Sequence, residues 1–422
     1  MLLGAIADDF TGATDLCSML VRGGMRTVQL IGAPSADTAV PDADAIVVAL
    51  KSRTAPVRQA VDEALAALKW LQAAGARQYF FKYCSTFDST DQGNIGPVAD
   101  ALVAALGCGF ALACPAFPTN ARTVYLGHLF AGGSLLNESG MENHPLTPMT
   151  DANLVRVLSR QTEGTVGLVP FVTVDQGAHA IRDAMTQLKE RGRRYAIVDA
   201  ITDAHLVAIG EAAAGHALIT GGSGVAMGLP GNFRRAGLLS DTIDPGALPP
   251  LDGACAVVAG SCSRATLAQL GYARDHLPVY ELDAFATQDA AALSDAALTW
   301  AADKIGSKPV VIAASAPPDK VTALQARLGR DQAGALIEDA VARIAEGLVA
   351  RGVRKMVIAG GETSGAVVGR LGVHSLRIGG EIDPGVPWTL ASGRGADLML
   401  ALKSGNFGAT DFFLKAFRVL EG

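Results

Sequence analysis

The sequence lacks the features that mark several classes of protein. No stretch approaches the roughly 20 consecutive apolar residues of a membrane helix, and Asp8 and Asp9 interrupt the apolar start before it could form a secretory signal. The formal net charge is -6 and no cluster of Lys and Arg stands out, which argues against a nucleic-acid surface. The six cysteines form neither a CxxC pair nor a Cys/His metal pattern. We therefore expect a cytoplasmic protein with reduced thiols, without nucleic acid or membrane as a partner.

Two familiar phosphate-binding motifs are also missing. The chain has no G-x-x-x-x-G-K-[ST] sequence, which excludes a Walker-type NTPase. The segment TGGSGVAMG has Met227 where a dinucleotide fingerprint has its last glycine, so we interpret it as structural. A dehydrogenase is therefore an alternative that lacks its sequence signature.

The chain does show an alternation of short β-rich runs and longer helical stretches over 422 residues. Runs such as AIVVAL and PVVIAAS are apolar throughout, which is typical of strands buried on both faces of a parallel sheet. The segment LLSDTIDPGALPPLDG (238–253) breaks this pattern with three prolines and two glycines. The sequence predicts an α/β protein with two domains, each a mostly parallel sheet flanked by helices, over 1–240 and 254–422, with a linker at 241–253.

Residues 120–155 interrupt the alternation. This insertion is rich in Gly, Asn and Pro, and we expect weak regular structure in it. A long irregular insertion in a compact domain is more often functional than idle. His128 and His144 lie within it and are candidates for ligand contact.

The stretch IADDFTGATD ends the first predicted strand with five polar side chains. Ligands of open α/β sheets bind beyond the carboxyl ends of the strands, which is where these residues would lie. One alternative is that Asp9 or Thr11 only caps the next helix. That alternative explains one residue, whereas binding of a polyol also explains Asp8, Thr14 and Asp15.

Two more polar clusters follow predicted strands. KSRT (51–54) offers Arg53 for bidentate binding of a carboxylate. FFKYCSTFDSTDQGN (80–94) offers Lys82, a cation suited to a carboxylate or to a transferring phosphoryl group. This second cluster adds hydroxyl and carboxylate groups at Ser85, Thr86, Asp88, Ser89, Thr90 and Asp91. Any one cluster could be an ordinary surface loop, but three at one sheet edge favour a substrate site.

The carboxyl-terminal half has glycine-rich loops instead of charged ones. They are VVAGSCS (257–263), VIAGGETSG (357–365) and LKSGNFG (402–408), and each lies at or near an apolar run. Glycine lets the backbone approach a phosphate closely, and a helix N-terminus favours its charge. One such loop is often a simple turn, but three in one domain favour nucleotide binding.

Taken in order, the motifs resemble those of the four-carbon acid sugar kinases. The resemblance rests on ADDFTGATD, FKYCSTFDST, CPAFPTNARTVYLGHLF, NESGMENHPLTPM, AGGETSG and IDPGVPW, and it runs across nearly the whole chain. The insertion is most similar to that of the branch that acts on 3-oxo-tetronate.

The resemblance implies an amino-terminal substrate domain, a carboxyl-terminal ATP domain, and phosphorylation of the 4-hydroxyl of a four-carbon sugar acid. The ATP contacts that it implies are Ser261, Gly360, Gly361, Glu362, Thr363 and Gly405. Mg²⁺ is implied by ATP chemistry, since no ligand spacing indicates it and the metal ligands stay unknown. Gly405, Asn406 and Gly408 would cradle the γ-phosphate.

Phosphoryl transfer to an alcohol needs positioning, neutralisation of charge and an acceptor for the hydroxyl proton. Asp8 and Asp9 are the candidates for the base and for binding substrate hydroxyls, with Asp88 in reserve. Lys82 and Arg53 would hold the carboxylate or stabilise the moving phosphoryl group. The substrate-binding candidates are Thr11, Thr14, Arg53, Ser85 and Thr86.

Two alternatives stay open at this point. A D-erythronate or L-threonate 4-kinase would have the same overall design with another substrate. A non-catalytic sensor of sugar acids would keep the amino-terminal clusters but would need no phosphate loops. The sequence leaves the oligomeric state open.

Overall fold

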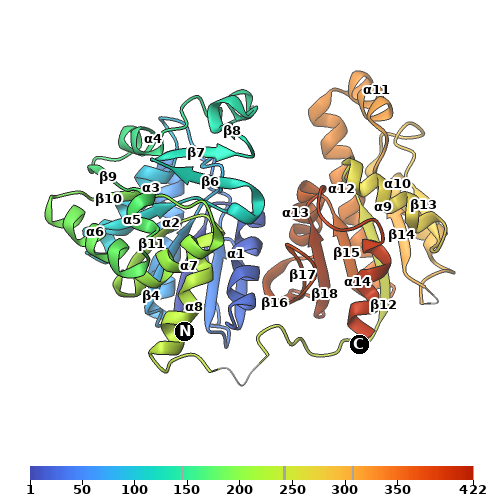
Figure 1. The fold of residues 1–422 in the computed structure, drawn as a ribbon. Helices are drawn as coiled ribbons and strands as arrows, with labels where there is room; N and C mark the ends of the chain where they lie inside the picture. The colour runs from blue at the N-terminus through green and yellow to red at the C-terminus, as the bar shows by residue number, and fades with distance from the viewer. Residues whose placement is uncertain (145, 241–243, 307, 422) are drawn as a thin grey trace. The chain divides into compact units, whose positions relative to one another are not determined.

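The computed structural model describes residues 1–144, 146–240, 244–306 and 308–421. The chain divides into two compact units, Met1–Pro245 and Gly246–Gly422 (Figure 1). The division falls inside the linker predicted at 241–253. Each unit is a sheet with helices packed on it, so the predicted α/β class is confirmed.

The main sheet of the N-terminal unit is parallel at every neighbouring pair. Its strand order is β2-β3-β1-β4-β11-β5-β10-β9. The strands are β1 (Leu3–Ala7), β2 (Thr27–Ile31), β3 (Ala45–Ala49), β4 (Gln78–Lys82), β5 (Ala111–Cys114), β9 (Val166–Val169), β10 (Tyr195–Val198) and β11 (Leu218–Gly221). Central strands such as β1, β3 and β4 are buried along their whole length, which explains their unbroken apolar sequence.

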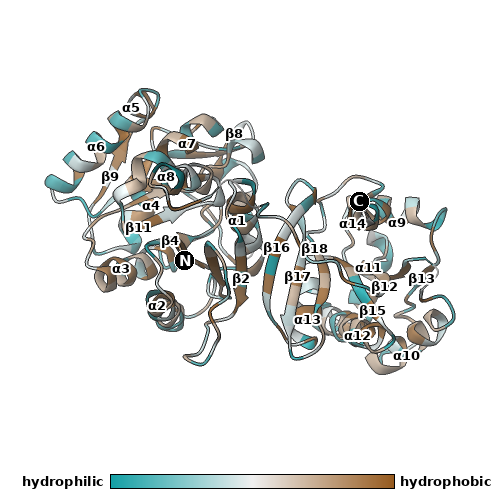
Figure 2. Ribbon diagram, turned by 90° about the horizontal axis from the view of Figure 1, so that it is seen from below, coloured by the Kyte–Doolittle hydropathy of each residue, from teal (hydrophilic) through white to brown (hydrophobic). Residues whose placement is uncertain are grey.

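Helices connect and cover these strands, and stretches of hydrophilic residues show on α2 and α6 (Figure 2). The helices are α1 (Phe10–Arg22), α2 (Val57–Ala73), α3 (Ile95–Leu106), α4 (Leu154–Gln161), α5 (Phe171–Val174), α6 (Ala178–Glu190), α7 (Asp203–Ala212) and α8 (Leu229–Arg235). Short 3₁₀ segments lie at Pro118–Asn120, Leu136–Glu138, Met141–Asn143, Ala213–Gly215 and Ser223–Gly228.

The prediction of weak regular structure in the insertion was wrong for its first part. β6 (Arg122–Tyr125), β7 (His128–Ala131) and β8 (Ser134–Leu135) form a separate antiparallel sheet. Leu126 (φ 48°) and Gly127 (φ 74°) are left-handed in the first turn, and Gly132 (φ 65°) is left-handed in the second. Val124 and Leu129 bury one face. The strands are so short that their alternation is hard to see in the sequence.

The C-terminal unit has the strand order β13-β14-β12-β15-β18-β17-β16. The strands are β12 (Ala254–Ala259), β13 (Val279–Glu281), β14 (Val310–Ala313), β15 (Val353–Ala359), β16 (Val373–Asp383), β17 (Val386–Gly393) and β18 (Leu398–Lys403). β17 is antiparallel to both neighbours, and its hairpin with β16 turns at Gly385 (φ 78°). The alternation in the sequence did not predict this hairpin.

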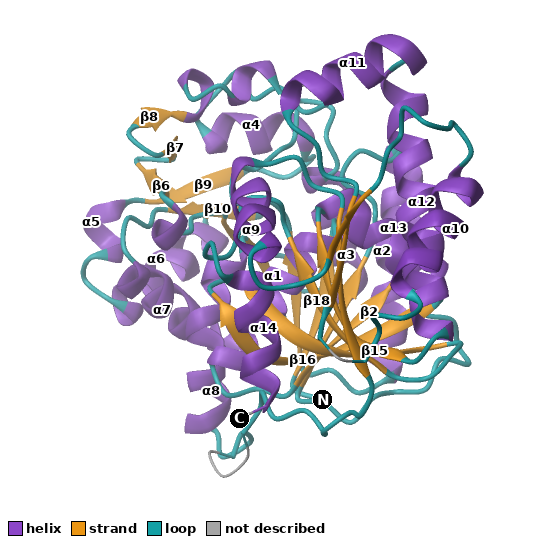
Figure 3. Cartoon of the chain, turned by 90° about the vertical axis from the view of Figure 1, so that its right-hand side faces the viewer, coloured by secondary structure: helices purple, strands orange, loops and turns teal. Residues whose placement is uncertain are grey.

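The helices of the C-terminal unit lie around its sheet, as Figure 3 shows for the strands β15 and β18 and the helices α12 and α14. They are α9 (Arg264–Arg274), α10 (Ala290–Ala301), α11 (Pro318–Leu328), α12 (Arg330–Ala350), α13 (Gly361–Arg370) and α14 (Phe412–Glu421). One core cluster joins Val257, Val357, Ala401 and Trp388 to Phe412 of α14. This core holds the ends of β12, β15 and β18 in fixed register.

Candidate active site

The three polar loops of the N-terminal unit meet because β3, β1 and β4 are neighbours in the sheet. The Asp8 backbone N–H donates to the Lys82 carbonyl at 3.0 Å, and the Ser52 N–H donates to the Asp8 carbonyl at 3.0 Å. The three segments that the sequence singled out therefore form one edge, as the parallel sheet requires.

Arg53 is the centre of this cluster. Its Nε and Nη2 donate to the two carboxylate oxygens of Asp8, both at 2.9 Å, and Nη2 also donates to Asp9 Oδ1 at 2.6 Å. Nη1 lies 3.7 Å from Asp88 Oδ2. Nε and Nη2 of the guanidinium therefore bind carboxylates of the chain itself. Nη1 has no partner at hydrogen-bond distance among these carboxylates and is the donor most open to a ligand.

Burial and the ion pair oppose each other in the electrostatics of Asp8 and Arg53. Burial raises the pKa of Asp8, while the Arg53 guanidinium opposes that rise. Burial acts to lower the pKa of Arg53, but the carboxylates of Asp8 and Asp9 together offset it, so the pKa of Arg53 rises. This pair keeps Arg53 charged and fixed in place.

Asp9 has a different environment from Asp8. It is the N-cap of α1, and its Oδ1 accepts the Gly12 N–H at 3.2 Å as well as the bond from Arg53. Its side chain is 28% exposed, whereas that of Asp8 is 7% exposed. Among the described residues, no group of the protein bonds to Asp9 Oδ2. Asp9 is therefore both a helix cap and a carboxylate with one oxygen free for a ligand.

Lys82 lies buried at the end of β4, with its Nζ donating to the Tyr83 carbonyl at 2.7 Å. No carboxylate in the described part of the chain comes within 4.0 Å of that ammonium. A Cβ at Gly12 would lie 2.8 Å from Lys82 Nζ and would collide with Asp9 Oδ1. Glycine at this position therefore lets the helix N-terminus, the cation and the carboxylate come together.

Asp88 lies on a strained turn. Phe87 and Asp88 have positive φ angles of 63° and 35°, which non-glycine residues seldom adopt. Phe87 is buried and packs edge-on against Tyr83, with ring centroids 5.4 Å apart. Thr86 Oγ1 donates to Asp88 Oδ1 at 2.6 Å. Packing therefore fixes the turn and turns Asp88 toward Arg53.

The remaining predicted residues differ in burial and in whether the protein already binds their side chains. Thr11 is exposed and Ser85 is half-buried near the cluster. Thr14 is buried in α1, and its hydroxyl donates to Gln29 Oε1 at 2.9 Å. In the insertion, His128 contacts the Leu126 carbonyl and Asn153, and His144 Nδ1 bonds with Thr147. Substrate contact by Thr14 stays a prediction with no structural support.

The sequence reasoning missed Asn94. Its Nδ2 donates to the carbonyls of Ser52 (2.7 Å), Ala55 (2.9 Å) and Arg53 (3.3 Å). Asn94 therefore holds the loop that carries Arg53. No distinct signal marks this role in the sequence, because Asn just before a helix ordinarily indicates an N-cap, yet here the side chain makes no cap bond.

The three glycine loops of the C-terminal unit also converge. Ala259, Ala359 and Lys403 lie side by side at the ends of β12, β15 and β18. A Cβ at Gly260 would collide with Thr363 Oγ1, and one at Gly405 would collide with Ser261 Oγ. Gly360 has φ 131° and precedes α13. Glycine is therefore needed at these positions for the loops to approach one another, as expected for a phosphate site.

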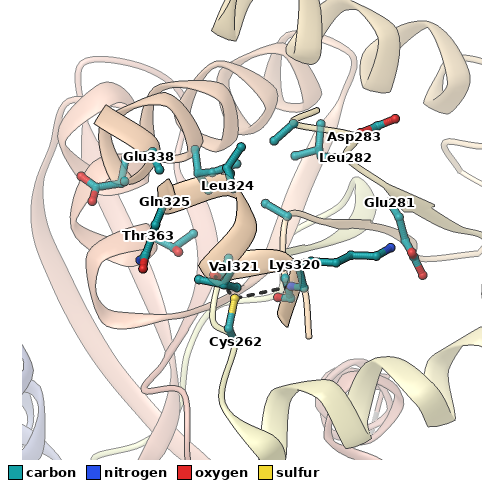
Figure 4. A pocket seen from close by; sticks show the side chains of 18 of the residues that line it. Cys262, Glu281, Leu282, Asp283, Lys320, Val321, Leu324, Gln325, Glu338 and Thr363 are labelled. Carbon is teal, nitrogen blue, oxygen red and sulfur yellow. Dashed lines mark hydrogen bonds between the residues drawn. The ribbon is translucent and has the colours of Figure 1, made fainter. Parts of the chain in front are cut away.

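A cavity of about 480 Å³ opens beside these loops (Figure 4). Gly260, Cys262 and Thr363 line one side of it, and Glu362 and Glu338 add carboxylates. Its apolar wall consists of Leu282, Ala284, Phe285, Val321, Leu324 and Ile337. The volume and the mixed lining are those of a site for a small organic ligand.

The described ranges contain no group of three or more His, Cys, Asp and Glu side chains arranged to hold a metal ion. In the same part of the chain, no helix has both the length and the apolar character to cross a membrane. The six cysteines all lie in the described ranges and form no disulfide.

Comparisons with known proteins match both units. Residues 3–229 match the model of a sugar-binding N-terminal domain, and residues 256–413 match that of a nucleotide-binding C-terminal domain. A 3-oxo-tetronate kinase of Burkholderia multivorans is 59% identical over 100% of this chain and 98% of its own length. One from Salmonella typhimurium is 43% identical over 99% of both chains. A solved structure of a Haemophilus influenzae protein has a TM-score of 0.88 at 43% identity, covering 99% of this chain and 100% of its own.

Proposed function

This chain belongs to the four-carbon acid sugar kinase family, and on that premise we propose that it transfers the γ-phosphoryl group of ATP to the 4-hydroxyl of 3-oxo-tetronate. The observation that carries the proposal is the pairing of two kinds of site. A carboxylate and ammonium cluster lies at the strand ends of the sugar-binding unit, and converging glycine loops lie beside a cavity in the nucleotide-binding unit. The proposed location is cytoplasmic.

In this proposal Asp9 is the base that accepts the proton of the 4-hydroxyl. Its free Oδ2 and partial exposure fit the role, whereas both oxygens of Asp8 are bound to Arg53. Arg53 fixes the orientation of Asp9 and presents Nη1 toward the substrate. Lys82 supplies positive charge at the same edge, where it can attract the substrate carboxylate or the moving phosphoryl group. Asp88 stays the reserve candidate for the base.

ATP is proposed to place its adenosine against the apolar wall of the cavity and its phosphates on the glycine loops. Ser261, Gly360, Gly361, Glu362, Thr363 and Gly405 are its proposed contacts. Mg²⁺ is proposed to accompany ATP. The described side chains form no group of three or more metal ligands.

Substrate class is the first test. Coupled measurement of ADP release should show Mg²⁺-dependent turnover of 3-oxo-tetronate and much slower turnover of neutral tetritols. The reason is that Lys82 has no carboxylate partner in the described part of the chain, and its ammonium can bind the carboxylate of the acid, together with Nη1 of Arg53. D-Erythronate and L-threonate belong in the same panel, since a faster rate with either would move the specificity to that acid. Binding of a sugar acid without any ADP release would favour a sensor.

Thr363→Val tests the nucleotide half of the proposal. The Thr363 side chain is 5% exposed and lines the cavity, and its hydroxyl has no hydrogen-bond partner among the described residues. A hydrogen bond to a charged group contributes about 1.5–3 kcal/mol, so we expect KM for ATP to rise roughly tenfold or more. KM for the sugar acid should stay unchanged.

A matched control is Thr389→Val, in the same unit. The Thr389 hydroxyl donates to the Leu400 carbonyl at 2.8 Å, within the sheet. We expect this variant to lose stability but to keep its KM for ATP. Equal KM values for ATP in wild type and Thr363→Val would remove Thr363 from the nucleotide site.

A further inference from the structure

The C-terminal unit contains a buried lysine whose charge the proposed mechanism does not use. Lys403 is the last residue of β18 and has no exposed surface. Its Nζ donates to Thr266 Oγ1 (3.2 Å), to the Ser404 carbonyl (3.1 Å) and to the Gly405 carbonyl (3.0 Å). No carboxylate of the described residues lies within 4.0 Å of it. A buried ammonium without a counter-ion is costly, which calls for an explanation.

The backbone carbonyl groups of the loop after Lys403 accept hydrogen bonds from several side chains. The Gly405 carbonyl also accepts bonds from Ser263 Oγ at 2.6 Å and from Thr266 Oγ1 at 2.9 Å. Gln269 Nε2 lies 3.0 Å from the Phe407 carbonyl, 2.9 Å from that of Gly408 and 3.0 Å from that of Ala409. Side chains at the start of α9 and the Lys403 ammonium therefore bind one side of the loop.

A peptide group is planar and trans, so its C=O and its N–H point in opposite directions. Where a carbonyl of the loop accepts a hydrogen bond from α9 or from Lys403, the N–H of the following residue therefore points to the other side of the loop. This applies to the N–H groups of Gly405, Asn406 and Gly408, which follow the captured carbonyls of Ser404, Gly405 and Phe407. Within the described ranges these three N–H groups have no hydrogen-bond partner. Several N–H groups that point out of one loop form a binding site for an anion.

We propose that Lys403 is a positioning residue for the phosphoryl end of ATP. Its ammonium holds the loop 404–408 by the carbonyl groups, so that the N–H groups point at the phosphates, and its charge is balanced when the phosphates bind. This inference rests on the proposed function, since it takes ATP as the ligand. Thr266 and Gln269 hold the same loop without adding charge.

The titration of Lys403 follows from its surroundings. Burial lowers the pKa of Lys403 to about 8. Its hydrogen-bond partners are a hydroxyl and two carbonyls, and Ser263, Thr266 and Gln269 of α9 do not titrate in this range. The titratable groups of the adjoining segments are Cys262, Glu362, Asp383 and Lys415. The Asp383 carboxylate accepts the Ala409 N–H and pairs with the Lys415 ammonium. Bound phosphates favour the protonated form, so the pKa of Lys403 should rise on binding.

Calorimetric titration of the full chain with ATP, at pH 8 in buffers of different ionisation enthalpy, measures how many protons are taken up on binding and so tests the rise in the pKa of Lys403. We expect wild type to take up a fraction of a proton when it binds ATP and none when it binds adenosine. Lys403→Met should abolish the proton uptake and should weaken the binding of ATP by about tenfold or more. The affinity for adenosine should stay unchanged. Because the proton equilibria of ATP itself are common to both proteins, the difference in uptake belongs to Lys403.

Gln269→Leu is the matched variant, because it frees the carbonyls of the loop but leaves the charge. We expect weaker ATP binding with proton uptake retained. The proposal is overturned if wild type takes up no more protons on binding ATP than Lys403→Met does. It is also overturned if Lys403→Met loses affinity for ATP and for adenosine by the same factor. Should Lys403→Met not fold, Lys403→Arg takes its place, because an arginine stays protonated at pH 8 and cannot take up a proton; wild type should then take up more protons with ATP than Lys403→Arg does, and equal uptake overturns the proposal. Failure of wild type to bind ATP at all would instead contradict the proposed function.

Discussion

Asp9→Asn should lower kcat by roughly 10²–10⁴ while the protein stays folded, because the substitution removes the proton acceptor and keeps the volume of the side chain. The rate of ADP release at saturating ATP and sugar acid measures this. KM for ATP should change little, since the proposed nucleotide site lies in the other unit.

The helix-cap interpretation of Asp9 makes the opposite prediction for the rate. Asn caps a helix nearly as well as Asp, so Asp9→Asn should retain the bond from the Gly12 N–H and the unfolding midpoint under both interpretations. A folded Asp9→Asn protein with near-normal kcat would assign Asp9 to capping alone. The base would then have to be Asp8 or Asp88, and Asp88→Asn is the next variant to assay.

Arg53→Met should destabilise the N-terminal unit by about 3–5 kcal/mol, because it leaves the Asp8 carboxylate buried without its cation. Denaturant unfolding followed by circular dichroism measures the loss. In the variant the pKa of Asp8 should rise further than burial already raises it in wild type. The folded state then binds a proton that the unfolded state does not, so stability falls as pH rises through the window above the ordinary pKa of 3.8.

The double variant Asp8→Asn/Arg53→Met is the control for this explanation. It removes the buried charge together with its partner, so it should be more stable at pH 8 than Arg53→Met alone and should lose the pH dependence. If the double variant is no more stable than the single one, the loss comes from packing of the arginine side chain.

The sequence by itself determined the α/β class and the strand ends that carry the two clusters, and it predicted a division at the linker. These follow from local patterns, because apolar runs specify buried strands and a parallel sheet brings all their carboxyl ends to one edge. The loops with Asp8, Arg53 and Lys82 had to meet once their strands paired. For the same reason, the three glycine loops had to converge.

Tertiary structure alone decided which atoms pair within those clusters. Arg53 binds Asp8 across 45 positions of sequence, and Lys403 contacts Thr266 across 137. No local pattern encodes such partners, because they depend on which loops the packed core brings into contact and how their backbones turn. The same holds for Thr14, whose hydroxyl is taken by Gln29, and for Asn94, which holds a loop instead of capping its helix. The sequence therefore predicted which loops lie together, and the packing of the fold assigned each side chain its partner.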